Sequence, residues 1–355
     1  MRPRAFLSVA AVLTSAACGG PATTSNEPIP APAPPATTGH NGAAPTPPHA
    51  GPPVGLGDYH GGPPYPIVLM HGMGGFDKLT GAVQLTYFND VVADLAASGE
   101  TDVYVTVAPP YDTSEDRAQA VLPQIQKILD ETGKDKVNLI GHSQGGMDAR
   151  LIASPAGSGF GAHIASVTTV ATPHRGSLVA DAVLGTLQGV PPSVIDQVTS
   201  AALSLLEKTA YDVQNDPDLR AQMTELSQQY MTTVFNPKYV DDPRVAYSSY
   251  GGRTNLETGQ TDCASAVYAD TPTRVDEAQP EVQPLAQFLQ GTTDVTNDGL
   301  VTVQSARWGT FLQCVPADHL KEVGQIAQNG ADPMSGFDHL AFFRQVVARI
   351  RSAGY

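Results

Sequence analysis

The chain has 355 residues, and its 35 acidic and 20 basic side chains leave a formal net charge of −15. This acidity argues against a nucleic-acid partner, because phosphate backbones bind to dense positive surfaces. Hydrophobic residues make up 41% of the chain, so a sizeable core can form only if the 30 prolines are concentrated outside it.

The first residues have the pattern of an export signal. Arg2 and Arg4 precede an apolar stretch that is too short to span a bilayer, and small residues then lead to Cys18. A cysteine at this point is similar to the lipobox of bacterial lipoproteins, where it is acylated and becomes the mature N-terminus, although that motif prefers an aliphatic residue in place of Ser15. Residues 1–18 therefore predict export, with acylation of Cys18 favoured over plain secretion.

Residues 19–64 are rich in Pro, Ala, Thr and Gly and have too little apolar surface to offset the entropy of ordering. They predict a disordered linker that holds the remainder of the chain away from the cell envelope. No later stretch is long and apolar enough to predict a transmembrane helix.

Residues 65–355 alternate between two hydrophobic patterns. Short apolar runs rich in β-branched residues predict strands buried on both faces, at 67–70, 103–107, 137–140 and 167–170. Between the second and third strands, apolar residues from Ala118 to Leu129 recur every three or four positions, with Thr113 and Ser114 as candidate caps and Gly133 as a stop, which predicts a helix. This alternation predicts an α/β domain whose mainly parallel sheet is covered by helices and carries active residues at the carboxyl ends of its strands.

The third strand runs directly into Gly141-His-Ser-Gln-Gly145, a G-x-S-x-G motif followed by a helical segment. Glycines are needed on both sides of Ser143, because the serine of a sharp strand-to-helix turn has a strained backbone that leaves no room for neighbouring side chains. Such a turn exposes the hydroxyl at the positive end of the helix, where a nucleophile is favoured. A chance serine in a glycine-rich turn is the weaker interpretation, and His142 is assigned a structural role.

The first strand leads into His71-Gly-Met-Gly-Gly75, a loop in the place where an acyl-transfer enzyme needs backbone N–H groups for the developing oxyanion. We assign the two donors to Met73 and Gln144. A phosphate-binding glycine loop is the alternative, but no Lys-Ser or Lys-Thr pair follows it. His71 is expected to fix the loop through a hydrogen bond.

A nucleophilic serine needs a base and an orienting carboxylate, and with a G-x-S-x-G turn these follow in the chain order Ser, Asp, His. Asp298, in Asn297-Asp-Gly299, is the candidate acid, although an ordinary Asp-Gly turn gives the same pattern. Only His319 and His339 lie beyond it. His339 begins a helical pattern, where a cap or packing role is natural, so its position favours His319 as the base.

Three segments, 65–73, 137–146 and 167–177, together resemble the bacterial true lipases of the pseudomonad type, which have the α/β-hydrolase fold. The resemblance continues with gaps to the C-terminus and includes Asn297-Asp-Gly299 and His319-Leu-Lys-Glu322. It implies hydrolysis of long-chain triacylglycerols. The site residues that it implies are the triad Ser143, Asp298 and His319 and the oxyanion donors Met73 and Gln144. His174 and Arg175, in a Thr-Pro-His-Arg-Gly motif specific to these enzymes and their kin, are assigned structural roles.

The structural calcium site of that family uses an aspartate two residues after the catalytic histidine, where this chain has Lys321. Because an ammonium group cannot ligate calcium, the sequence predicts no cofactor and no calcium site of the family type. The charge of Lys321 is expected to replace the ion by pairing with an upstream acidic residue, with Asp276 and Glu277 as candidates. Members of the family often need a dedicated membrane-bound foldase, which is therefore a candidate partner.

Cys263 and Cys314 are the only cysteines besides Cys18, and export favours a disulfide bond between them over two buried thiols. The loop that they close contains Asp298 and ends shortly before His319, although the family places its second cysteine closer to the acid. Reduction is expected to loosen this half of the site first.

Residues 177–239 predict a helical lid insertion. Apolar residues recur at helical spacing from Val194 to Leu206, and a second stripe from Leu219 to Tyr230 follows Asp216-Pro217 as cap and first turn. In a lipase, such a cover closes over the serine in water and opens onto lipid. A cover packed immovably on the core is the alternative.

The sequence therefore predicts an exported or lipid-anchored serine carboxylic ester hydrolase, with triacylglycerol lipase as the first activity. Two alternatives stay open. One keeps the chemistry but acts on short-chain esters or polyesters, and the other is a surface-anchored binding protein that retains the fold without activity. Membrane contact is expected through an acyl group on Cys18 and through the lid.

Overall fold

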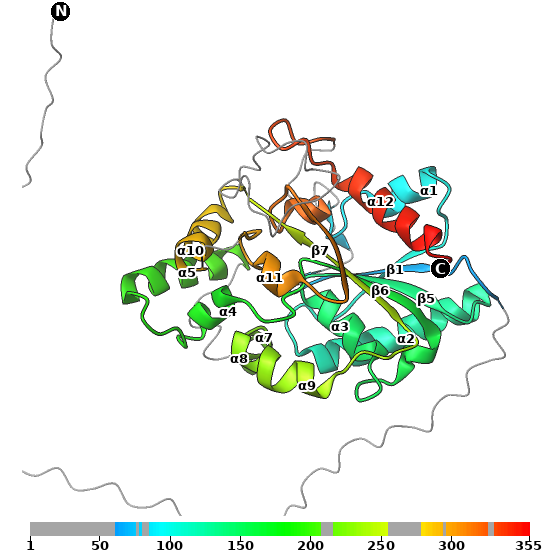
Figure 1. Ribbon diagram of the computed structural model, residues 1–355, viewed down its shortest axis with the longest axis horizontal. Helices are drawn as coiled ribbons and strands as arrows, with labels where there is room; N and C mark the ends of the chain where they lie inside the picture. Colours follow the sequence, from blue (N-terminus) through cyan, green and yellow to red (C-terminus); the bar gives the residue numbers. More distant parts are fainter. Residues whose placement is uncertain are drawn as a thin grey trace, which may run out of the picture. The chain divides into compact units, whose positions relative to one another are not determined.

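A six-stranded parallel sheet, in the order β4-β1-β5-β6-β7-β8, forms the centre of the part of the chain that is described (Figure 1). Its strands are β1 (Ile67–Met70), β4 (Val103–Thr106), β5 (Val137–His142), β6 (Ile164–Val170), β7 (Ala246–Gly252) and β8 (Thr310–Val315). The computed structural model describes residues 61–75, 78–79, 85–206, 216–254, 278–293, 296–325 and 330–355. The predicted parallel α/β architecture is confirmed, and the four predicted strands are β1, β4, β5 and β6.

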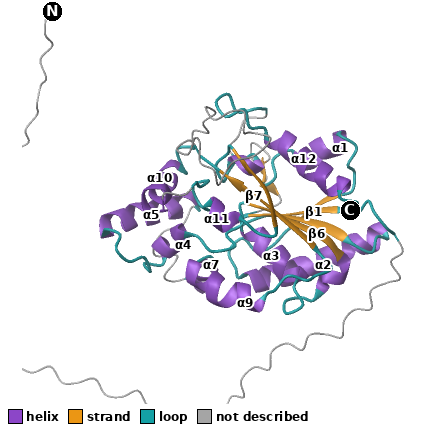
Figure 2. Cartoon of the chain, viewed as in Figure 1, coloured by secondary structure: helices purple, strands orange, loops and turns teal. Residues whose placement is uncertain are grey.

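Helices cover both faces of the sheet (Figure 2). Neighbouring side chains along a strand such as β1 therefore enter different cores. In β1, Val68 and Met70 belong to the core that contains apolar residues of α2 (Ser114–Thr132) and α3 (Gln144–Ala153). Ile67 and Leu69 belong to the other core, formed with α1 (Val91–Ala97) and α12 (His339–Ser352). A continuous apolar run is therefore what a central strand of this sheet requires.

Helix α2 follows the predicted start and stop signals. The side chain of Thr113 accepts a hydrogen bond from the backbone N–H of Asp116, which caps the first turn. Gly133 ends the helix with a φ of 65°, a left-handed conformation that costs glycine least.

A helical insertion separates β6 from β7 (Figure 1). It consists of α4 (Leu178–Val183), α5 (Pro192–Leu205), α7 (Pro217–Glu225), α8 (Gln228–Tyr230), the π-helix η2 (Met231–Phe235) and α9 (Asn236–Lys238). Asp216 caps α7 as predicted, because its carboxylate accepts the N–H groups of Asp218 and Leu219. The predicted helical stripe to Tyr230 is wrong in one respect, since α7 ends at Glu225.

The break after α7 has a local cause. The Leu226 carbonyl accepts the N–H of Ser177 (2.8 Å), and the Ser227 hydroxyl caps α8 by accepting the N–H of Tyr230 (3.2 Å). Gly176 lies so close to this turn that a Cβ atom there would be 2.4 Å from the Cα of Gln228. The turn therefore packs on the segment that leaves β6.

A cluster around Trp308 joins the end of the insertion to the sheet layer. The guanidinium of Arg150, in α3, lies 3.5 Å from the Trp308 ring centroid and donates to the Asn236 side chain in α9 (3.0 Å). The Trp308 indole N–H donates to Asp241, and the His174 ring stacks on the indole with a centroid distance of 5.1 Å. His174 thus has the structural surroundings that were predicted for it.

The remaining elements complete the domain. They are the short antiparallel pair β2 (Lys78–Leu79) and β3 (Leu85–Thr86), η1 (Phe160–His163), α10 (Gln283–Thr293), α11 (Val303–Ala306) and η4 (Lys321–Val323). Arg175 donates to the carbonyls of Gln304 and Arg307 and so holds the segment around α11. No helix in the described ranges has the length and apolar character needed to cross a membrane.

Several predictions fall on residues that are not described. The predicted export signal, Cys18, Cys263 and residues 19–60 of the predicted linker lie outside the described residues. Residues 61–64, which the sequence assigned to that linker, are described. Gly61 forms a parallel bridge with Lys134, and the Lys134 ammonium donates to the Gly62 carbonyl (2.9 Å).

Candidate active site

Ser143 lies on the turn between β5 and α3, at the carboxyl end of a central strand. Its φ of 54° and ψ of −130° place it in a strained region of backbone space, which persists because the surroundings fix the turn. The Ser143 N–H donates to the Val170 carbonyl (2.9 Å), and its carbonyl accepts from the Thr172 hydroxyl (2.7 Å). This geometry presents the hydroxyl beyond the sheet edge, as the motif predicted.

Crowding explains the glycines of the motif. A Cβ at Gly141 would be 2.5 Å from the Gly145 carbonyl carbon, and one at Gly145 would be 2.3 Å from the Met70 carbonyl oxygen. At Gly146 a Cβ would be 2.0 Å from the Thr172 hydroxyl. Each added carbon meets atoms that hold the turn in place, so these positions admit only glycine.

Asp298 and His319 form a buried hydrogen-bonded pair. The His319 Nδ1 and the Asp298 Oδ2 are 2.8 Å apart, and the His319 N–H donates to the Asp298 carbonyl (3.0 Å). The other carboxylate oxygen accepts the backbone N–H groups of Leu300 (2.8 Å) and Val301 (2.7 Å). The carboxylate is therefore held from both sides, and it fixes the histidine tautomer that leaves Nε2 free to accept a proton.

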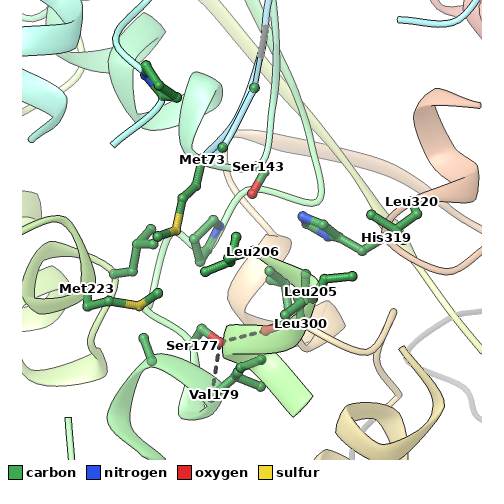
Figure 3. A pocket seen from close by; sticks show the side chains of 18 of the residues that line it. Met73, Ser143, Ser177, Val179, Leu205, Leu206, Met223, Leu300, His319 and Leu320 are labelled. Carbon is green, nitrogen blue, oxygen red and sulfur yellow. Dashed lines mark hydrogen bonds between the residues drawn. The ribbon is translucent and has the colours of Figure 1, made fainter. Parts of the chain in front are cut away.

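Ser143 and His319 meet at a cavity of about 480 Å³ beneath the insertion. In Figure 3 the serine oxygen and the imidazole ring of His319 point toward one another across its upper part. Apolar residues of β-sheet loops and of the insertion line the rest, among them Met73, Val179, Leu205, Leu206 and Met223. The three predicted triad residues, from three separate segments, are thus brought to one site, whereas His339 bonds to the Asn89 carbonyl in the α12 region.

The two predicted oxyanion donors flank Ser143. Gln144 is the first residue of α3, and Met73 lies in the loop after β1 and lines the same cavity. Neither backbone N–H has a hydrogen-bond partner among the described residues. Two unpaired N–H groups on adjacent turns are what an oxyanion hole requires.

His71 fixes the loop that carries Met73. Its Nε2 accepts the N–H of Ala108 (3.1 Å), so Nδ1 carries the proton and donates to the Gly72 carbonyl (2.9 Å). Burial and the neighbouring positive charge of Arg117 lower the pKa of His71 to about 4, which keeps the ring neutral at neutral pH. The predicted loop-fixing hydrogen bond is therefore present.

Arg117 supports the same loop, although no motif marks it. Its side chain is completely buried, and its guanidinium donates to the carbonyls of His71 (2.6 Å) and Pro109 and to the carboxylate of Asp148 (2.9 Å). Burial raises the pKa of Asp148 to about 6 even beside this cation. The only sequence signal is a charged residue beside the apolar stripe of α2.

Behind the catalytic candidates, His142 and Glu322 form a second buried pair. The His142 Nε2 and the Glu322 Oε2 are 3.2 Å apart, and the Tyr87 hydroxyl lies 2.7 Å from the His142 Nδ1. The His142 and His319 rings have a centroid distance of 4.5 Å. Burial and the nearby His319 hold the pKa of His142 well below its usual value. His142 is thus a packing neighbour of His319, in line with the structural role predicted for it.

Lys321 and Cys314 lie on the segments that flank His319. The Lys321 ammonium is 3.2 Å from a carboxylate oxygen of Asp332, which follows it in the chain, whereas the predicted candidates Asp276 and Glu277 lie outside the described residues. Cys314 is buried near the end of β8. Because Cys263 is not described, the disulfide bond between the two stays a prediction.

Glu225, in α7, connects the insertion to the start of α2. Its carboxylate accepts the N–H of Ser114 at the start of α2 (2.6 Å) and the hydroxyl of Tyr230 (3.3 Å). Burial raises the pKa of Glu225 to about 7; the Ser114 and Tyr230 bonds lower it, while Asp148 and Glu115 raise it further. The folded protein therefore binds this proton more tightly than the unfolded chain does.

We expect Glu225→Gln to change the pH dependence of stability. Because the pKa of this acid is raised on folding, its ionisation removes stability as the pH rises from about 4.5 through about 7. Relative to the Tm of the wild type, the Tm of the variant should therefore become higher as the pH rises from 5 to 8. Glu131→Gln, at an exposed position of α2, is the matched control. Parallel Tm curves for wild type and Glu225→Gln would contradict the expectation.

The chain matches a family profile and several known proteins. The profile of the palmitoyl protein thioesterase family matches residues 66–255, more than half of the chain. A triacylglycerol lipase of Vibrio cholerae is 30% identical over 293 residues, which cover 82% of this chain and 88% of that protein. A triacylglycerol lipase of Burkholderia plantarii is 28% identical over 321 residues, and the alignment covers 82% of this chain and 87% of that protein.

Solved structures show the same fold. Lipase 1 from Pelosinus fermentans superimposes with a TM-score of 0.53 at 16% identity, covering 81% of this chain and 98% of that one. The mature Bacillus licheniformis lipase BlEst2 gives a TM-score of 0.51 at 19% identity, covering 73% and 86%. A parallel sheet with a serine on a strand-to-helix turn defines an α/β-hydrolase. The chain belongs to the palmitoyl protein thioesterase family as its profile defines it, and it is a relative of the bacterial triacylglycerol lipases that its motifs resemble.

Proposed function

We propose that the protein hydrolyses carboxylic esters of lipids, with triacylglycerols as the first substrate class and Ser143 as the nucleophile. The observation that carries this proposal is the hydrogen-bonded Asp298–His319 pair at the same apolar cavity as Ser143. The names of the relatives add to it, because triacylglycerol lipases match most of the chain.

The arrangement supports an acyl-enzyme mechanism. The His319 Nε2 takes the proton of the Ser143 hydroxyl while the serine oxygen attacks the ester carbonyl, and Asp298 stabilises the imidazolium that forms. The N–H groups of Met73 and Gln144 bind the oxyanion of the tetrahedral intermediate. His319 then gives its proton to the leaving alcohol, and water, activated by the same imidazole, releases the fatty acid and regenerates the serine.

The cavity favours an acyl chain over a compact polar substrate. Its lining is predominantly apolar, and it extends in Figure 3 from Ser143 down to Val179 on α4. Burial of methylene groups in such a space stabilises binding by about 0.8 kcal/mol for each group. Short-chain esters fill less of it, which makes a short-chain carboxylesterase the second candidate.

One experiment tests the chemistry and the substrate class together. The purified protein is treated with a fluorophosphonate, and peptide mass spectrometry locates the adduct, which is expected on Ser143. A series of p-nitrophenyl esters then gives kcat/KM against chain length, which is expected to rise from acetate to longer acyl groups. An unlabelled serine would favour the inactive binding protein, and a maximum at acetate would favour the short-chain esterase.

Export and membrane contact belong to the same proposal. An acyl group on Cys18 would hold the domain at an envelope surface, and the apolar face of the insertion would meet lipid there. A mature N-terminus without an acyl group, found by mass spectrometry of the native protein, would leave plain secretion. A membrane-bound foldase is a further candidate partner.

We propose that this activity does not require calcium. A calcium site of the family type does not fit the residues, because the ammonium of Lys321 stands where a carboxylate ligand is required and is 3.2 Å from the Asp332 carboxylate. The neighbouring Asp318 carboxylate accepts the backbone N–H groups of Gln279, Leu320 and Lys321. Protein donors thus fix the segment after His319.

We expect Lys321→Met to lower the Tm by a few degrees and to reduce activity, because the Asp332 carboxylate loses a partly buried cation. Addition of EDTA to the wild type should leave both activity and Tm unchanged. Lys127→Met, at an exposed ion pair of α2, is the control. Activity that vanishes on chelation and returns with calcium would contradict the proposal.

A further inference from the structure

Gln222, on α7 of the insertion, makes a buried polar contact with the serine turn. Its side chain is completely buried, and its Nε2 donates to the Oε1 of Gln144 (2.6 Å) and to the Pro110 carbonyl (3.2 Å). Gln144 in turn donates through its own Nε2 to the Asp112 carbonyl (3.1 Å). A side chain of the insertion therefore orients the residue that follows the nucleophile.

The Pro110 carbonyl connects Gln222 to the other half of the site. This oxygen also accepts the backbone N–H of Gly74 (2.8 Å), the residue next to Met73. Gln222 thus bonds directly to Gln144 on one side and, through one carbonyl, to the neighbour of Met73 on the other. This amide therefore bridges the two turns that carry the oxyanion donors, beside the direct bond of Gln144 to the Asp112 carbonyl and the bonds of Arg117 to the loop after β1.

We propose that Gln222 is a positioning residue that sets the relative placement of the Met73 and Gln144 N–H groups. The proposal rests on the proposed function, in which these groups bind the oxyanion. Such donors must lie about 2.7–3.1 Å from the oxyanion, so a small shift of either turn weakens transition-state binding. Buried hydrogen bonds between fixed partners restrict that shift.

This role also assigns different parts to the helices of the insertion. Helix α7 is held to the serine turn by Gln222 and to the start of α2 by Glu225. It therefore stays seated during turnover as part of the catalytic framework. Opening of the cavity falls to other parts of the insertion, such as α5, whose Leu205 lines the cavity.

The test is Gln222→Met, which keeps the approximate length of the side chain and removes its hydrogen bonds. We expect kcat on a p-nitrophenyl ester to fall about 10- to 100-fold with KM changed less than about twofold, since the loss of a donor itself costs about 10²–10³. An alkyl boronic acid, which mimics the tetrahedral intermediate, should bind more weakly by a similar factor, and the matching alkyl alcohol should bind as before.

The controls separate positioning from general destabilisation. Thr224→Ala, on the exposed face of the same helix, should leave kcat and boronate affinity unchanged. Gln144→Met and the double variant complete a double-mutant cycle, in which the effects should be strongly non-additive because Gln222 acts through Gln144. If Gln222→Met does not fold, Gln222→Leu removes the same donor with a smaller apolar side chain, and the same loss of kcat is expected.

Two results would overturn the inference while leaving the proposed function intact. They are a Gln222→Met enzyme with unchanged kcat and boronate affinity, and additive effects in the cycle. Failure of the proposed function looks different, since in that case the wild type itself would hydrolyse no ester or Ser143→Ala would retain full activity.

Discussion

Ser143→Ala should reduce ester hydrolysis about 10⁶-fold in kcat, the scale seen when the nucleophile of a serine triad is removed. Alanine keeps the Cβ that already occupies the strained turn, so the substitution removes one oxygen and leaves the turn unchanged. The Tm should stay within about one degree of the wild type. Single-turnover and steady-state hydrolysis of a p-nitrophenyl ester, with the Tm measured in parallel, check this expectation.

A matched control is Ser98→Ala, at an exposed serine that ends α1, which should leave the activity unchanged. Asp298→Asn adds a second check, because an amide at this place would no longer hold the His319 tautomer that leaves Nε2 free. A loss of about 10⁴ in kcat is expected. Retention of wild-type activity by Ser143→Ala would exclude the acyl-enzyme mechanism.

Of all the substitutions proposed, Arg117→Met should lower the free energy of unfolding most, by about 3–5 kcal/mol. The substitution leaves Asp148 as a buried carboxylate without its cation and deprives the carbonyls of His71 and Pro109 of a donor. Because burial already raises the pKa of Asp148 to about 6, the carboxylate can escape part of this cost by protonation in acid. The loss should therefore be greater at pH 8 than at pH 5, as measured by denaturant unfolding.

The double variant Arg117→Met/Asp148→Leu tests the cause. Removal of both charges should recover part of the lost free energy, whereas an unrelated packing defect would make the double variant as unstable as the single one or worse. Arg220→Met, at an exposed position of α7, should change stability by less than about 0.5 kcal/mol. Recovery of stability without recovery of activity would indicate that the guanidinium also holds the Met73 loop in its active geometry.

The serine turn and the sheet could be predicted because their sequence signals are local. The glycines at 141 and 145 are required by contacts with atoms a few residues away or on the adjoining strand, and the β-branched runs are required by burial on both faces. The cap of α2 at Thr113 and its glycine stop follow from the same kind of short-range rule. The pairing of Asp298 with His319 also agrees with the chain order expected for such a turn.

The supporting residues could not be predicted in the same way. Arg117, Gln222 and Glu322 lie in helical segments with ordinary patterns, and each acquires its partner only when distant segments pack together. The end of α7 was misplaced for a similar reason, since the Leu226 carbonyl is bound by Ser177 from the other end of the insertion. Helical periodicity carries no information on such long-range bonds.

The cluster around Trp308 has a practical consequence, because Trp308 is the only tryptophan of the chain. Its emission reports on the junction where Arg150 and His174 stack on the indole. A denaturation curve followed by fluorescence therefore records loss of this cluster, through which Arg150 also binds Asn236 of α9. The same curve followed by circular dichroism records loss of the whole backbone fold, and a difference between the two midpoints would measure how independently this cluster melts.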